Sequence, residues 1–155
     1  MAKDTTKNVA LEAGKKINKK AEINEAYFVG LVWADPYEAY ANYNDTLVMD
    51  EFIHEIWGFY FELGKRMYLD GIKDFDTITV QKKVKEYNVE EEFKKYGGLD
   101  QINDAVNIVK EHSDNIEYYY ETIKYHYTIK QLVLVFGDKV LVPRGKYKWE
   151  DMSKE

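Results

Sequence analysis

The histidines come closest to residues whose types and spacing could form a chemical site. Glu51 and His54 stand three residues apart, which is half of the carboxylate-bridged di-iron pattern. That pattern needs a second Glu-x-x-His, and the sequence has none. Glu121 and His126 are five residues apart and would point in different directions on a helix. The sequence therefore predicts no metal site, and His54 and His126 are interpreted as ordinary helix residues.

Nucleotide and nucleophile chemistry also lack their motifs. A phosphate-binding loop needs Gly, four residues, then Gly-Lys followed by Ser or Thr. The Gly-Lys pairs at Gly14, Gly64 and Gly145 lack both the earlier glycine and the hydroxyl. No cysteine is present, which excludes disulfides and thiolate ligands. The acidic run at 90–92 is typical of a solvated face. We therefore expect a chain that is not an enzyme and that binds no cofactor.

Composition limits the remaining classes. The chain has 155 residues, enough for one domain with its own core, and a net charge of -6 that argues against DNA binding over the whole surface. No apolar run approaches the roughly 20 residues of a membrane span, and the lysine-rich N-terminus lacks a secretory core. We expect a cytoplasmic protein without membrane contact. Only two prolines and almost no strand-like alternation predict an all-α fold.

The elements that would position any site are helices. Residues 1–21 are lysine-rich and are interpreted as a flexible basic arm, which is either a solvated tail or a phosphate contact. A head over residues 22–98 would hold helices at 23–34, 37–43 and 50–69 and another after Asp76. Asp35-Pro36 is expected to end the first of these helices and Gly71 the third, and the pair Gly97-Gly98 is expected to break the chain before the last two helices. Apolar residues at steps of three and four within 50–69 indicate a buried stripe.

After the glycine pair, helices over 99–111 and 115–136 are expected to form an antiparallel hairpin with a turn at 112–113. The last helix carries an apolar arc nearly twice as wide as the roughly 100° that docks a helix on its own core. One apolar flank is expected to pack inward and consists of Ile116, Tyr120, Ile123 and Tyr127. The other is expected to bind a second copy and consists of Tyr118, Tyr125, Ile129 and Leu132. The helical wheel leaves open that the two flanks are exchanged, or that the whole helix is internal.

The order of these signals resembles the N-terminal domain of DnaB-type replicative DNA helicases. The resemblance covers about residues 22–136 and rests on short motifs in sequence order: Asp50-Glu51-Phe52 with His54 and Ile56, Asp76-Thr77-Ile78-Thr79-Val80, Tyr96-Gly97-Gly98-Leu99 with Ile102, and Asn115-Ile116 with Tyr118 or Tyr119.

The resemblance implies a helical head and a hairpin (99–136) that pairs two protomers, with three pairs forming a collar above a hexameric ATPase ring. It implies docking of primase and of a helicase loader, with DNA reached only through the parent ring. ATP and Mg²⁺ would belong to a motor domain that this chain lacks. The segment 137–155 would be a linker toward that domain, and the helix-start signal at Ser153 favours an excised fragment.

Three alternatives stay open at this point. One is the helicase-binding domain of a primase, which has a similar fold. Another is a stand-alone phage or plasmid replication regulator of the same fold. The third is a small helical enzyme or metal protein, a different class that metal analysis and an ATPase assay would detect.

Overall fold

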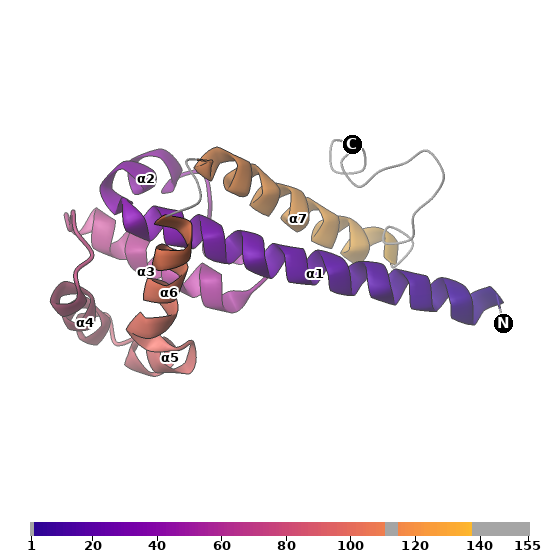
Figure 1. Cartoon of the computed structure of the whole chain (residues 1–155), viewed down its shortest axis with the longest axis horizontal. Coiled ribbons are helices and arrows are strands. Elements are labelled where there is room, and N and C mark those ends of the chain that lie inside the picture. The colour runs from indigo at the N-terminus through magenta and orange to yellow at the C-terminus, as the bar shows by residue number, and fades with distance from the viewer. Residues whose placement is uncertain (1, 111–114, 138–155) are drawn as a thin grey trace.

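Helices make up most of the residues that the computed structural model describes, which are 2–110 and 115–137. Figure 1 shows helices α1 to α7 with a short 3-10 turn, η1, between α2 and α3, and no strand occurs within the described ranges. The predicted all-α class is confirmed. The helix bounds are α1 Ala2–Ala34, α2 Pro36–Tyr43, η1 Met49–Glu51, α3 Glu55–Leu69, α4 Thr77–Glu86, α5 Glu90–Lys95, α6 Gly98–Lys110 and α7 Ile116–Phe136.

The first helix is much longer than the sequence predicted. It runs unbroken from Ala2 to Ala34, so most of the segment expected as a flexible arm belongs to α1. No proline interrupts these residues, and Pro36 follows directly after the helix ends and opens α2. In Figure 1 the N-terminal half of α1 extends away from α2 to α6, and its first turns reach past the end of α7. Residues 2–21 are helical because lysine and alanine favour a helix even where no apolar stripe marks one.

The core forms where the C-terminal half of α1 crosses α3. Phe28 and Val32 of α1 and Tyr60 and Phe61 of α3 are completely buried. Tyr60 donates from its hydroxyl to the carbonyl oxygen of Gly98 at 2.7 Å, which ties α3 to the start of α6. Aromatic rings therefore supply both the bulk of this core and some of its polar links.

The long helix of the sequence prediction begins later than expected. Residues 49–51 form the 3-10 turn, and α3 starts at Glu55 with His54 as its N-cap residue. The end of α3 at Leu69 agrees with the prediction, because Gly71 adopts a positive φ of 87° just after Asp70.

Local signals do set the start of α4 and of α6. Asp76 accepts a hydrogen bond from the backbone N–H of Thr79 at 2.9 Å, as its N-cap position predicts. Gly97 and Gly98 both have positive φ values, 106° and 62°, and the chain turns there into α6.

The expected hairpin of the last two helices is not the arrangement found. Both α6 and α7 pack against α1 and share few contacts with each other. α7 runs back along α1 in the opposite direction, toward the N-terminus, whereas α6 lies across α1 (Figure 1). The antiparallel pair is therefore α1 and α7, and we call the part of this pair that extends away from the head the two-helix arm (residues 12–21 and 123–136).

Candidate functional site

The two-helix arm has one buried seam. Ile123 and Ile129 of α7 are 0% and 2% exposed, and His126 between them is 5% exposed. Ala21 of α1 is fully buried as well. Their spacing of three residues along α7 places these side chains on one face, and because α1 is the helix against which α7 packs most, that face meets α1.

The burial of the predicted interface residues does not follow the expected division into an inward and an outward flank. Ile129, expected on the outward flank, is buried, and this part of the prediction is wrong because its helical face is turned to α1. Tyr118 is 57% exposed, as expected for that flank. Tyr125 and Leu132 from the outward flank are half-buried. Tyr127 was expected to pack inward and is also only half-buried.

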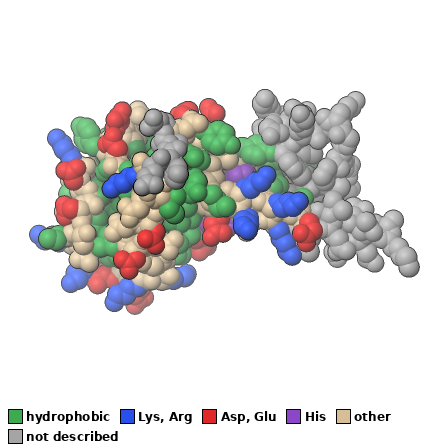
Figure 2. Space-filling model, viewed as in Figure 1, with side chains coloured by type: hydrophobic (Ala, Val, Ile, Leu, Met, Phe, Trp, Pro, Cys, Tyr) green, Lys and Arg blue, Asp and Glu red, His purple; other side chains and the backbone are tan. Residues whose placement is uncertain are grey.

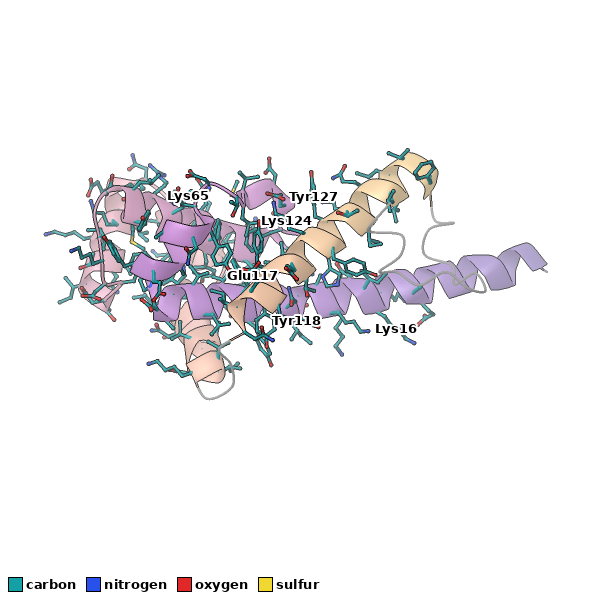
Figure 3. The ribbon with its side chains drawn as sticks, turned by 90° about the horizontal axis from the view of Figure 1, so that it is seen from above. Lys16, Lys65, Glu117, Tyr118, Lys124 and Tyr127 are labelled. Carbon is teal, nitrogen blue, oxygen red and sulfur yellow. The ribbon has the colours of Figure 1, made fainter. Side chains whose placement is uncertain are left out.

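The rest of the inward flank lies where the sequence placed it. Ile123 is buried, and Ile116 and Tyr120 are half-buried against the core. Figure 3 shows Tyr118 and Tyr127 on opposite sides of α7, with Lys124 on the side of the head. Asn24 of α1 donates from its amide to the carbonyl oxygen of Tyr119 at 3.0 Å, which fixes how α7 is rotated on α1.

An apolar surface at the end of α7 was not among the predicted interface residues. Leu134, Val135 and Phe136 are 71%, 72% and 63% exposed. We call these three residues the distal apolar end. Its signal in the sequence is the short apolar run at 132–136, which is too short to span a membrane but unusually apolar for an exposed helix end.

The α1 side of the arm is basic. Lys15, Lys16, Lys19 and Lys20 are all exposed, and Lys15 forms a loose ion pair with Glu12 at 3.9 Å. Figure 2 shows Lys side chains gathered along the described part of the arm. The arm therefore combines a basic surface on α1 with an apolar end on α7.

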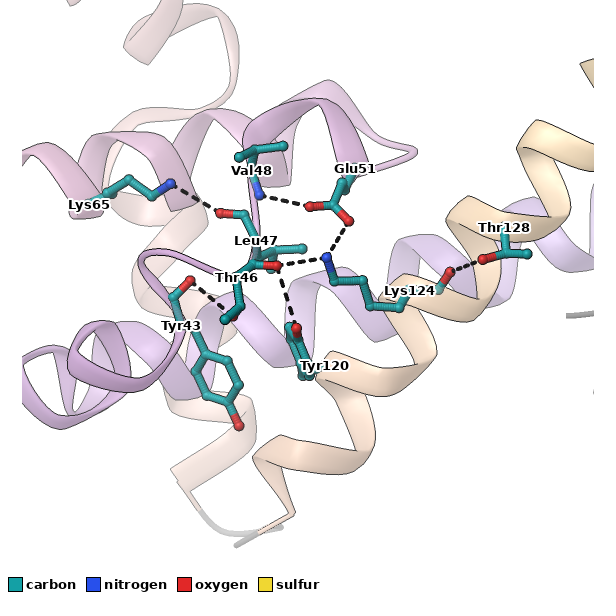
Figure 4. Close-up of polar contacts among 9 residues, drawn as sticks. All are labelled: Tyr43, Thr46, Leu47, Val48, Glu51, Lys65, Tyr120, Lys124 and Thr128. Carbon is teal, nitrogen blue, oxygen red and sulfur yellow. Dashed lines mark hydrogen bonds and ion pairs between the residues drawn. The ribbon is translucent and has the colours of Figure 1, made fainter. Parts of the chain in front are cut away.

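A polar network clamps the start of α7 to the loop before α3 (Figure 4). Lys124 forms an ion pair with Glu51 and donates to the carbonyl oxygen of Thr46 at 2.7 Å. The Tyr120 hydroxyl donates to the same carbonyl oxygen, and Glu51 in turn accepts from the backbone N–H of Val48 at 3.1 Å. Glu51 is 15% exposed and Lys124 is 36% exposed, so the ion pair is partly shielded from solvent and links α7 to the head.

A buried carboxyl group of α1 anchors the residues just before α3. Glu25 of α1 is fully buried and accepts hydrogen bonds from the backbone N–H groups of Ile53 and His54, at 2.7 and 2.9 Å. Burial raises the pKa of Glu25 to about 7, against the lowering by those two hydrogen bonds. The Nε2 of His54 lies 3.0 Å from the carbonyl oxygen of Asn18. These contacts hold the residues that lead into α3 against α1.

His126 is buried in the arm with its Nδ1 unpartnered within the described residues. Burial lowers the pKa of His126 to about 4, with a smaller contribution from the charge of Lys20. A neutral imidazole of this kind could ligate a metal, but no group of three or more His, Cys, Asp or Glu side chains gathers among those that the structure describes, in residues 12–110 and 115–137. His54 and Glu51 belong to the capping and clamping contacts instead.

Comparisons with known proteins yield no relative. No family model, no curated protein and no solved structure matches this chain. Within the described ranges, no helix combines the length and apolarity needed to cross a bilayer.

Proposed function

We propose that this chain is a non-catalytic assembly and docking domain of a ring-forming replicative DNA helicase, similar in role to the N-terminal collar of DnaB-type helicases. In this proposal it pairs with a second copy, receives primase and a loader, and acts in the cytoplasm. ATP and Mg²⁺ would be used by a motor domain elsewhere in the parent protein. The order of motifs across residues 22–136 supports the family, and the distal apolar end of α7 carries the proposal of self-association.

Burial of the distal apolar end can supply enough free energy to pair two copies of the chain. Full burial of a Leu, Val or Phe side chain stabilises a complex by about 1.5–3 kcal/mol. A twofold dimer buries the same three residues from both copies. Six such side chains together can offset an association cost of roughly 4–15 kcal/mol. Because the margin is small, we expect dimerisation in the micromolar range for the isolated chain.

Sedimentation velocity over a range of protein concentrations tests the proposal. The double variant Leu134→Lys with Val135→Lys should raise the dimer dissociation constant by roughly tenfold or more, because burying an unpaired ammonium is costly. Lysine is chosen since a positive charge near a helix C-terminus does not destabilise the helix. Leu69→Lys, which replaces a leucine of the head that is 66% exposed, is the matched control.

The control variant should associate like the wild type, and circular dichroism should show unchanged helix content in both variants. A wild-type chain that sediments as a monomer at every accessible concentration would remove the assembly proposal. So would a double variant that dimerises as tightly as the wild type.

A further inference from the structure

A pocket lies at the end of the head, between α4 and α5 and beside the first residue of α6. Its volume is about 580 Å³, which falls within the range of sites that hold a small molecule or a few side chains of a peptide. Val84 and Phe93 form its apolar floor and are almost completely buried, whereas Ile78 is 76% exposed at its edge. Figure 1 shows α4 and α5 at the opposite end of the molecule from the N-terminus. The pocket is therefore separate from the two-helix arm.

The rim of the pocket is basic, and no ion pair within the described residues neutralises its lysines. Lys82, Lys85 and Lys94 line it, and within the described residues none of the three forms an ion pair. Lys83, next to them in sequence, instead contacts Asp70 at 3.5 Å and Glu86 at 3.2 Å. Among the lining residues Glu90 is the single carboxylate, so the pocket carries a positive balance in a chain whose net charge is -6.

We propose that this pocket binds a short acidic segment of a partner protein, with an apolar side chain inserted against Phe93 and Val84 and with flanking carboxylates paired to Lys82, Lys85 and Lys94. The apolar floor disfavours a free hydrated anion, which would have to lose water without gaining partners there. Three lysines around one hollow also do not form the extended basic track that a nucleic-acid backbone follows. Protein interfaces commonly have an apolar core that is buried on binding and a charged rim that selects the partner.

Fluorescence anisotropy of a labelled peptide tests this inference. The probe is a short synthetic amphipathic peptide with a leucine stripe flanked by glutamates, and its partner probe has lysines in place of the glutamates. The acidic peptide should bind, the basic one should not, and binding should weaken as salt is raised.

Three variants locate the binding. Lys82→Glu with Lys94→Glu should weaken the acidic peptide by roughly tenfold. Ile78→Ser, at the exposed apolar edge, should weaken it by roughly fivefold. Lys16→Glu with Lys19→Glu makes the same charge change on the arm and should leave the affinity within about twofold, because charges beyond a Debye length are screened.

Equal binding of the two peptides, or equal loss in the pocket and arm double variants, would overturn the inference. So would a labelled single-stranded oligonucleotide that binds through Lys82 and Lys94 and is unaffected by Ile78→Ser, because the lysines would then serve nucleic acid. The inference does not depend on the proposed helicase role. Sedimentation reports on the arm and anisotropy on the pocket, so the two proposals can fail separately.

Discussion

At the residue scale, two buried titratable side chains, Glu25 of α1 and His126 of α7, make the stability of the fold depend on pH in opposite senses. Glu25 has a raised pKa, about 7, so the folded state holds its proton more tightly than the unfolded state does. Its contribution to stability is present at low pH and is lost as pH rises from about 4.5 to about 7. His126 has a lowered pKa, about 4, so its contribution is lost as pH falls from about 6.5 to about 4.

His126→Leu separates these two effects. The variant keeps Glu25, so the difference in unfolding free energy between wild type and variant isolates the histidine. We expect the wild type to lose about 1–3 kcal/mol relative to the variant between neutral pH and pH about 4. Near neutral pH the variant should be at least as stable, because it removes a buried Nδ1 that has no partner among the described residues. Urea unfolding at several pH values measures this, and parallel pH profiles for both proteins would contradict it.

At the element scale, the packing of α1 on α6 depends on a missing side chain. A Cβ built on Gly30 would lie 2.6 Å from the carbonyl oxygen of Ala105, which is backbone and cannot rotate away. The two helices can approach this closely only because residue 30 is glycine. The sequence did not reveal this role, since a glycine inside a helix is usually a weakness.

Gly30→Ala should therefore destabilise the fold by about 1–3 kcal/mol, even though alanine is the better helix former by about 1 kcal/mol. Thermal unfolding followed by circular dichroism at 222 nm measures the change in Tm, and helix content at low temperature should be nearly unchanged. An unchanged or higher Tm would mean that α1 and α6 can separate without cost.

At the scale of the whole molecule, the choice of partner for α7 decides what its substitutions do. Ile129 would have been a dimer contact if α7 had packed on α6 and left the flank that contains Ile129 facing outward. It is 2% exposed in the seam with α1, so its environment is already apolar within one chain.

Ile129→Glu should consequently lower the unfolding free energy by about 3–5 kcal/mol, because it buries an unpaired carboxylate. Tyr118→Glu is the matched control, since Tyr118 is 57% exposed on the same helix and should change stability by less than about 0.5 kcal/mol. Chemical denaturation of both variants distinguishes them. A stable Ile129→Glu protein that has lost only its tendency to dimerise would restore the original assignment of the flanks.

The all-α class and several helix boundaries follow from the amino-acid sequence alone. Pro36, Gly71, Asp76 and the Gly97-Gly98 pair act on the backbone within one or two turns, so their effects can be predicted without knowing the rest of the chain. The width of the apolar arc on α7 also indicated that this helix needs more than one neighbour.

Which helix faces meet depends on contacts between distant parts of the chain. The rotation of α7 is set by contacts such as that of Asn24 with Tyr119, which is 95 residues away. The chain just before α3 is held in place by Glu25, which accepts from the N–H groups of Ile53 and His54 and belongs to another helix. The pocket over Phe93 exists because α4 and α5 are brought together with α6. A helical wheel contains only local periodicity, and the burial of one flank or the other depends on which distant side chains fill the space against it.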